Sequence, residues 1–304
     1  MYYYKLYGMK IASDIEFCQL VVCLDKKTPD IEILCGDIPH YILEKEKAGC
    51  KYEFGEKISW LANRTCYLYI EHGQKLIYQL KKDGLPNYLH TYILGWGMSM
   101  IAMQRGIIAM HCSAVADENG AILISGESGS GKSTLTSAFL ANGYRLMADD
   151  MAWVEDTKQG VIVSPAFPYQ KLCRDAAIAN GYRPDELYYI DETKDKFLVP
   201  YNGEFLIESV PVKGFIMLGI TDENEIICEE AVGLTKFQMI AGNQFLRALL
   251  GADKYKPVLG QKCLKIASEI PMYYLLRPDG KDTIHELIDK AFEISNTFDI
   301  RLNI

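Results

Sequence analysis

The chain has 304 residues, of which 49% are hydrophobic and 24% are charged. This composition fits one large or two smaller globular domains and excludes a disordered chain. The 32 basic and 40 acidic side chains give a formal net charge of -8, which repels nucleic acid and anionic membrane surfaces. We therefore expect no nucleic acid and no membrane among its partners.

Nine cysteines are an odd number, and they show no Cys-x-x-Cys spacing. A disulfide framework or a structural zinc site is not expected from this pattern, and a reducing compartment fits it. The first residues lack the basic and apolar segments of a secretory signal. We predict a cytoplasmic protein.

Residues 1–85 contain short alternating segments separated by turn residues, which predict a small β-rich N-terminal region. The clearest of these segments are residues 2–6, 31–34 and 66–70. Pro86 cannot extend a strand ladder and suits the first turn of a helix. A helix is therefore expected from Asn87 to Gln104, ending at Gly106, and the predicted domains are residues 1–85 and 86–304.

Two apolar runs, 107–116 and 121–125, flank a turn at 117–120 and predict a hairpin. Residues 134–142 predict a helix that stops at Gly143, and residues 145–154 predict the strand that follows it. Further strands are expected at 161–163, 214–218 and 225–229, and further helices near 235–250 and 283–296.

A glycine-rich segment lies between the second apolar run and the next helix. It reads Gly126, Glu127, Ser128, Gly129, Ser130, Gly131, Lys132, Ser133 and Thr134. Glycines allow backbone N–H groups at a helix N-terminus to close around a phosphate chain. Lys132 would reach the β- and γ-phosphates, and Ser133 would hold magnesium. A glycine- and serine-rich surface loop is the alternative, but the full pattern in this context predicts nucleotide binding.

Two carboxylates, Asp149 and Asp150, come where the strand after this helix is expected to end. Adjacent carboxylates could divide the metal-holding and proton-accepting roles of phosphoryl transfer. The alternative is an ordinary acidic turn.

His111 lies inside an apolar run and needs a hydrogen-bond partner there. It is either a core histidine satisfied by backbone or a group that orients the catalytic carboxylate.

Three blocks, residues 111–114, 122–133 and 143–150, resemble in order and spacing the catalytic domain of HPr serine kinases. The resemblance implies a mixed α/β fold like that of phosphoenolpyruvate carboxykinase, with a P-loop that binds ATP and Mg²⁺. It implies that Asp149 is the base, that Asp150 is its metal-side neighbour, and that His111 supports them.

The chain has no counterpart of that family's Ile-Pro-Val-x-x-Gly-Arg-Asn loop. Its segments 7–15 and 270–277 are instead similar to HPr-kinase-related proteins of peptide-modification systems, including kinases of lasso-peptide precursors. The implied acceptor is a serine of a peptide or small protein. HPr kinases assemble as hexamers, so a homo-oligomer is a further expectation.

Phosphoryl transfer gathers negative charge, so a cation beyond Lys132 is expected. The candidates, among which the sequence does not decide, are Lys171, Arg174, Lys196 and Arg247. The leading prediction is an ATP- and magnesium-dependent kinase that acts on serine. A small-molecule kinase of the same fold, and a nucleotide-sensing or ATPase module without an acceptor, are the alternatives.

Overall fold

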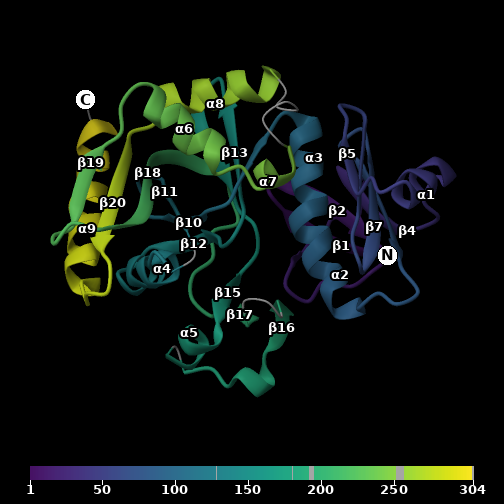
Figure 1. Cartoon of the computed structure of the whole chain (residues 1–304), viewed down its shortest axis with the longest axis horizontal. Coiled ribbons are helices and arrows are strands. Elements are labelled where there is room, and N and C mark those ends of the chain that lie inside the picture. The colour runs from purple at the N-terminus through teal and green to yellow at the C-terminus, as the bar shows by residue number, and fades with distance from the viewer. Residues whose placement is uncertain (128, 180, 192–194, 251–256, 303–304) are drawn as a thin grey trace.

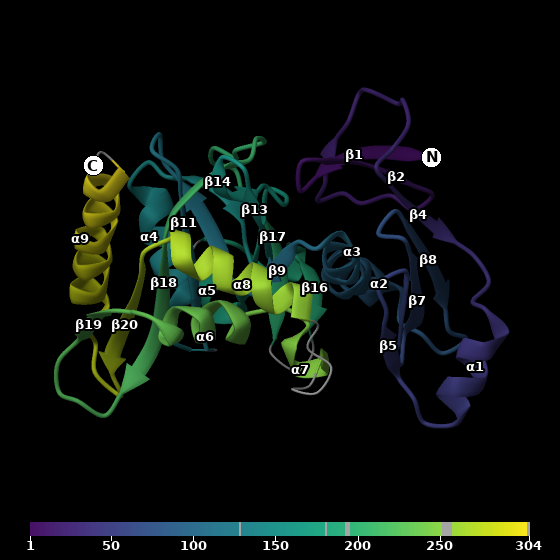
Figure 2. The ribbon, with the colours of Figure 1, turned by 90° about the horizontal axis from the view of Figure 1, so that it is seen from above.

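The computed structural model describes residues 1–127, 129–179, 181–191, 195–250 and 257–302. The chain has a mixed α/β architecture with an eight-stranded, a nine-stranded and a three-stranded sheet. In Figures 1 and 2 the first sheet lies on one side of the molecule and the nine-stranded sheet on the other, with a long helical segment between them.

The eight-stranded sheet is built entirely from the N-terminal part of the chain, in the order β3-β1-β2-β4-β8-β7-β6-β5. Its strands are β1 (Tyr2–Leu6), β2 (Met9–Ser13), β3 (Val21–Val22), β4 (Ile31–Cys35), β5 (Tyr52–Phe54), β6 (Ile58–Ala62), β7 (Cys66–Glu71) and β8 (Lys75–Leu80). The helix α1 (His40–Lys47) packs on it through Ile42, which shares a small core with Trp60 and Tyr69. The strands predicted at 2–6, 31–34 and 66–70 are confirmed as β1, β4 and β7.

The helical segment begins at Pro86 and ends at Gly106, as the sequence predicts. It consists of α2 (Pro86–Tyr92), a π-helical turn η1 (Ile93–Gly97) and α3 (Met98–Arg105), with Gly106 in the left-handed conformation (φ 71°). A Cβ at Gly97 would lie 2.5 Å from Cδ1 of Leu76 on the N-terminal sheet. The main hydrophobic core contains residues from both sides of this contact. The predicted domain boundary at residue 85 therefore stays a prediction.

The nine-stranded sheet carries the glycine-rich loop. Its main path is β12-β10-β11-β18-β14-β13-β9; β20 pairs with β18 on another edge, and β19 pairs with β20. The strands are β9 (Ile108–Met110), β10 (Ser113–Ala116), β11 (Ala121–Gly126), β12 (Arg145–Ala148), β13 (Ala152–Thr157), β14 (Gly160–Ser164), β18 (Val210–Thr221), β19 (Ile227–Glu230) and β20 (Met272–Pro278). The predicted hairpin is confirmed as β10 and β11, which pair antiparallel.

Two helices, α4 (Lys132–Ala141) and α9 (Ile284–Leu302), pack against β11, β18 and β20 around a core that includes Leu135, Phe139 and Phe298. Helices α6 (Leu234–Gly242), α7 (Arg247–Leu250) and α8 (Pro257–Glu269) lie between β19 and β20 in the chain. Helix α8 contacts β9, β13 and β14. Within the described ranges, no helix combines the length and the apolar character needed to cross a membrane.

Three predicted elements are each divided in the structure. The run 107–116 breaks at His111 and Cys112 into β9 and β10, which belong to different parts of the sheet. The run 145–154 breaks into β12 and β13 because Asp150 has a left-handed backbone (φ 73°). The predicted helix 235–250 stops after Gly242, because Gln244 leaves the helix to bridge Met110 of β9.

A three-stranded sheet, which the sequence analysis missed, has the order β15-β17-β16 and contacts α2. Its elements are β15 (Tyr169–Cys173), α5 (Arg174–Ala179), the 3₁₀ turn η2 (Pro184–Glu186), β16 (Tyr188–Asp191) and β17 (Lys196–Pro200). This small sheet sits below the rest in the view of Figure 1. It brings the segment around Lys171 toward the centre of the molecule.

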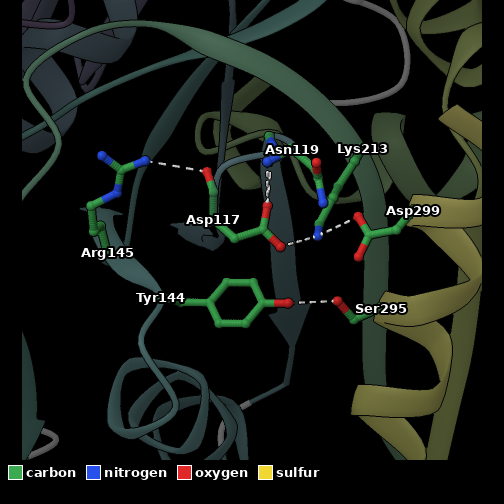
Figure 3. Close-up of polar contacts among 8 residues, drawn as sticks. Asp117, Asn119, Tyr144, Arg145, Lys213, Ser295 and Asp299 are labelled. Atoms are coloured by element: carbon green, nitrogen blue, oxygen red, sulfur yellow. Dashed lines mark hydrogen bonds and ion pairs between the residues drawn. The ribbon is translucent and has the colours of Figure 1, made fainter. Parts of the chain in front are cut away.

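A buried lysine ties α9 to the turn between β10 and β11 (Figure 3). The ammonium of Lys213 donates to Asp117 in that turn, and to Oδ1 of Asp299 on α9 at 2.8 Å. The Lys213 side chain has no exposed surface, and its ammonium lies 5.4 Å from the ring centroid of Tyr144. Burial lowers the pKa of Lys213, but the two carboxylates outweigh it and raise the pKa above its usual value.

Candidate functional site

The loop between β11 and α4 is shaped by its glycines and by its own hydrogen bonds. A Cβ at Gly126 would lie 2.4 Å from Oγ of Ser130, so only glycine fits there. The backbone N–H of Ser130 donates to the carbonyl of Glu127 at 3.2 Å, and its buried hydroxyl donates to the same oxygen at 2.8 Å. The loop is therefore closed into a defined turn.

The other two glycines of the loop have left-handed backbones, with φ 86° at Gly129 and φ 105° at Gly131. A Cβ at Gly129 would meet no atom within 4 Å, so the space beside this residue is open. Gly131 precedes α4, so the free N–H groups of that helix's first turn face the loop. Lys132 and Ser133 are half-buried in this turn and Thr134 is exposed. Ser128 lies outside the described residues.

Arg277, at the end of β20, contributes a cation to this loop that the sequence analysis did not consider. Its guanidinium donates to the carbonyl oxygen of Gly129 at 2.9 Å and to that of Pro278 at 3.2 Å. A guanidinium has five N–H donors, so donors remain for an anion in the loop. No motif near residue 277 signals this role, because the contact depends on β20 ending beside the loop.

Asp149 is buried and both of its carboxylate oxygens are engaged. Oδ1 accepts the hydroxyl of Ser113 at 2.7 Å, and Oδ2 accepts the backbone N–H of Lys171 at 2.7 Å. Only 8% of the residue is exposed. These bonds join β10, the end of β12 and β15, so Asp149 holds three segments of the site together.

Asp150 faces the charged groups of the site. Its Oδ2 lies 2.6 Å from Nζ of Lys171, and its Oδ1 lies 3.6 Å from Nε2 of His111. Burial by itself raises the pKa of Asp150. The charges of Lys171, His111 and Lys132 outweigh that and hold the pKa well below its usual range. The carboxyl is therefore ionised at neutral pH.

His111 is held by backbone contacts on one side and leaves its ring 48% exposed on the other. The backbone N–H of His111 donates to the backbone carbonyl of Asn243 at 2.7 Å. Oγ of Ser125 lies 2.7 Å from the His111 carbonyl and 2.7 Å from Oδ1 of Asn243, and its single proton can serve either oxygen. Partial burial is the largest influence on the pKa of His111 and lowers it, whereas Asp150 acts in the opposite direction.

Among the four candidate cations, Lys171 contacts the aspartates of the site. Lys171 contacts both aspartates, through its backbone N–H and its ammonium. Lys196 lies across the three-stranded sheet from Cys173, and its charge is among those that lower the pKa of His111. The small sheet thus places Lys171 beside Asp149 and Asp150.

Arg174 and Arg247 are engaged elsewhere. The guanidinium of Arg174 forms two hydrogen bonds with Asp195, at 2.6 and 3.0 Å, and lies over the ring of Phe197. Arg247 donates to the carbonyl of Ala241 at 3.2 Å. The geometry therefore favours Lys171 as the added cation of the site.

The donors of the site fit a nucleotide with magnesium better than a metal held by protein alone. In the part of the chain that the structure describes, no group of three or more His, Cys, Asp or Glu side chains could hold a metal ion. Magnesium is commonly held by one or two protein oxygens together with phosphates and water, and Ser133 could supply one such oxygen.

Burial raises the pKa of the Cys112 thiol to about 12. This neighbour of His111 is therefore not a thiolate nucleophile at neutral pH.

The comparisons with known proteins add little to this geometry. No protein-family model matches the sequence, and no curated protein matches it. Among solved structures, the chain is similar to an HPr(Ser) kinase/phosphatase from Coxiella burnetii. The identity is 15%, the match covers 64% of this chain and 99% of that one, and the TM-score is 0.32. A likeness this low does not carry the neighbour's activity to this chain.

Proposed function

We propose that this chain is an ATP- and magnesium-dependent kinase that phosphorylates a serine hydroxyl on a peptide or small protein. The observation that carries the proposal is the contact of Asp150 with Lys171, at 2.6 Å, and with His111, at 3.6 Å, in a chain whose glycine-rich loop opens α4. Phosphorylation of a hydroxyl requires a site that binds the phosphates and a carboxylate that accepts the hydroxyl proton. We assign these two roles to the glycine-rich loop and to Asp150.

The proposed roles differ in one respect from those that the resemblance implies. Both oxygens of Asp149 already accept hydrogen bonds, which supports a positioning role for that residue. Both aspartates line the pocket, but Asp150 is the one that contacts Lys171 and His111, and we assign it the proton-accepting role. A magnesium ion bound directly to Asp150 would approach the ammonium of Lys171, so Ser133 is the residue that would hold the metal.

The reaction balances with these groups. The acceptor hydroxyl gives its proton to Asp150, and its oxygen forms a new bond to the γ-phosphorus as the bond from that phosphorus to the β-phosphate's bridging oxygen breaks. ADP leaves with the electron pair of that broken bond. Lys132, the N–H groups of the first turn of α4 and Arg277 would stabilise the charge on the phosphates. Bound magnesium would neutralise part of that charge as well.

The test is incubation of the purified chain with ATP, magnesium and a panel of serine peptides, with HPr and small alcohols alongside. Intact mass should show one added phosphoryl group on a peptide. Phosphorylation of a small alcohol alone would replace the peptide by a small molecule as the acceptor. ATP hydrolysis with no phosphorylated product would favour the ATPase alternative.

A further inference from the structure

A small pocket opens beside the two aspartates, and its wall comes from several parts of the chain. Tyr7 and Gln19 belong to the N-terminal region, Thr91 and Gly95 to the helical segment, and Asp150 and Lys171 to the charged cluster. Its cavity volume is about 20 Å³. A single water needs roughly 10–15 Å³ on this measure, so the pocket accepts a group of one or two heavy atoms.

The tip of the first hairpin reaches within one residue of the catalytic carboxylate. The ring of Tyr7 stacks on Trp153 with centroids 4.3 Å apart, and its backbone N–H donates to the carbonyl of Pro165 at 2.8 Å. Its hydroxyl lies 3.3 Å from the carbonyl oxygen of Met151, the residue after Asp150. The N-terminal sheet is therefore fastened to the site.

Backbone strain is found at Asp150, which lines this pocket with a positive φ of 73°. Such a conformation costs free energy and persists where the surrounding structure imposes it, often at functional sites. The positive φ of Tyr7 (53°) belongs to the two-residue turn between β1 and β2. The π-helical turn at Ile93–Gly97 is a second irregularity of the wall, since Gly95 belongs to it.

We propose that this pocket receives the hydroxymethyl group of the acceptor serine, so that the N-terminal region helps to choose the acceptor. The inference rests on the proposed kinase function and adds the place and the size of its acceptor site. A serine side chain has two heavy atoms, which matches the pocket's volume. Its walls include the apolar side chains of Leu94, Phe167 and Leu198, and Asp150 faces the hydroxyl.

The helical wall offers the cleanest test. Thr91 is a half-buried residue of α2 that lines the pocket, and its substitution leaves the P-loop and the aspartates unchanged. Thr91→Leu should fill the pocket, and Thr91→Ser should widen it by one methyl group. Asn87→Leu is the matched control, because Asn87 lies one turn earlier on the same helix, is exposed and does not line the pocket.

The measurements are the kinetics of phosphorylation of paired serine and threonine peptides, together with ATP affinity. Thr91→Leu should lower kcat/KM for the serine peptide by about tenfold or more, since one carbon in a fitted pocket changes it by about 10- to 200-fold. Thr91→Ser should reduce the preference for serine over threonine, an effect that partial unfolding does not produce. ATP affinity should stay at the wild-type value in both variants.

The outcomes separate the two proposals. If the wild type phosphorylates a peptide and both Thr91 variants keep its rate and its serine preference, the acceptor pocket is wrong and the kinase function stands. If Asn87→Leu lowers kcat/KM as much as Thr91→Leu, the pocket assignment also fails. If the wild type phosphorylates no peptide, the proposed function fails and the pocket assignment falls with it.

Discussion

Two clusters of lysine and aspartate lie on the nine-stranded sheet and its connections, and they differ in how they are closed. At one, Lys213 is sealed between Asp117 and Asp299, with no exposed side-chain surface. At the other, Lys171 holds Asp150, which is 14% exposed and lines a pocket. Both are short ion pairs, yet only the second is open to a ligand.

The exposure of the two clusters indicates which buried charges stabilise the fold and which can react with a ligand. The lysine of the sealed cluster is satisfied by carboxylates from a hairpin turn and from α9, so it links secondary-structure elements (Figure 3). In the open cluster the carboxylate of Asp150 contacts Lys171 and a half-exposed histidine, His111. A substitution should therefore mainly affect stability at the first and activity at the second.

The largest expected effect is loss of phosphoryl transfer in Asp150→Asn. The amide keeps the shape but cannot accept the proton, and a general base contributes about 10²- to 10⁴-fold to rate. ATP affinity should remain, because Lys132 and the loop backbone are unchanged. The rate is measured by single-turnover phosphorylation and the affinity by titration calorimetry.

Asp149→Asn is the matched control for that assignment. Its amide can still accept from Ser113 or from the N–H of Lys171, so we expect a smaller loss of rate and a lower melting temperature. A rate loss in Asp149→Asn that exceeds that of Asp150→Asn would return the base role to Asp149.

The sealed cluster should respond through stability. Lys213→Met leaves two carboxylates without their shared cation, and breaking a buried ion pair costs about 3–5 kcal/mol. Activity per folded molecule should be unchanged. Chemical denaturation measures the loss, with Lys265→Met as a control because Lys265 pairs with Glu269 on an exposed helix face.

The same variant has a defined pH dependence. The folded pKa of Lys213 is raised, so its contribution is complete below the unfolded pKa of about 10.4 and is lost as pH rises through the folded value. The difference in free energy of unfolding between wild type and Lys213→Met should be constant near neutral pH. A difference that vanished on going from neutral pH to pH 9 would contradict the buried pairing.

The open cluster should respond through its pH profile. Burial raises the pKa of Asp150 and Lys171 is the largest influence that lowers it, so Lys171→Met should raise this pKa. Activity that needs the carboxylate is lost as pH falls through this pKa, which lies well below its usual range in the wild type. Relative to the wild type, kcat/KM of Lys171→Met should therefore fall further in acidic solution than at neutral pH. At neutral pH we expect a loss of about 10- to 100-fold, from a hydrogen bond to a charged group. A ratio of the two kcat/KM values that does not change with pH would contradict this dependence on Asp150.

The smallest expected effect belongs to Arg277. Arg277→Met removes one cation beside the carbonyl of Gly129 and should weaken ATP binding by about 2- to 10-fold, the range of one net hydrogen bond. Arg277→Lys keeps the charge and should recover part of the affinity, although it loses the planar fork. Unchanged ATP affinity in both variants would remove Arg277 from the phosphate site.

Local sequence was sufficient to predict the glycine-rich loop, the β10–β11 hairpin and the boundaries of the helical segment, because each depends on neighbouring residues. It was insufficient where tertiary contacts decide. The left-handed backbone of Asp150 divides a run that reads as one strand. Asn243 and Gln244 leave a predicted helix to pair with the segment around His111.

The surroundings of the two aspartates show the same limit. Their adjacency is visible in the sequence, but their different hydrogen bonds are not. Lys171 reaches them because β15 lies beside the end of β12, and no spacing rule selects it from the other basic residues. Arg277 reaches the loop from nearly 150 residues away in sequence.

The most direct test of the central claim is an experimental structure with magnesium and a non-hydrolysable ATP analogue. We expect the phosphates to bind in the loop between β11 and α4. The carboxylate of Asp150 should lie within about 3 Å, or one water, of the position that the attacking oxygen would occupy. Phosphates bound elsewhere, or an Asp150 that faces away from the terminal phosphate, would contradict it.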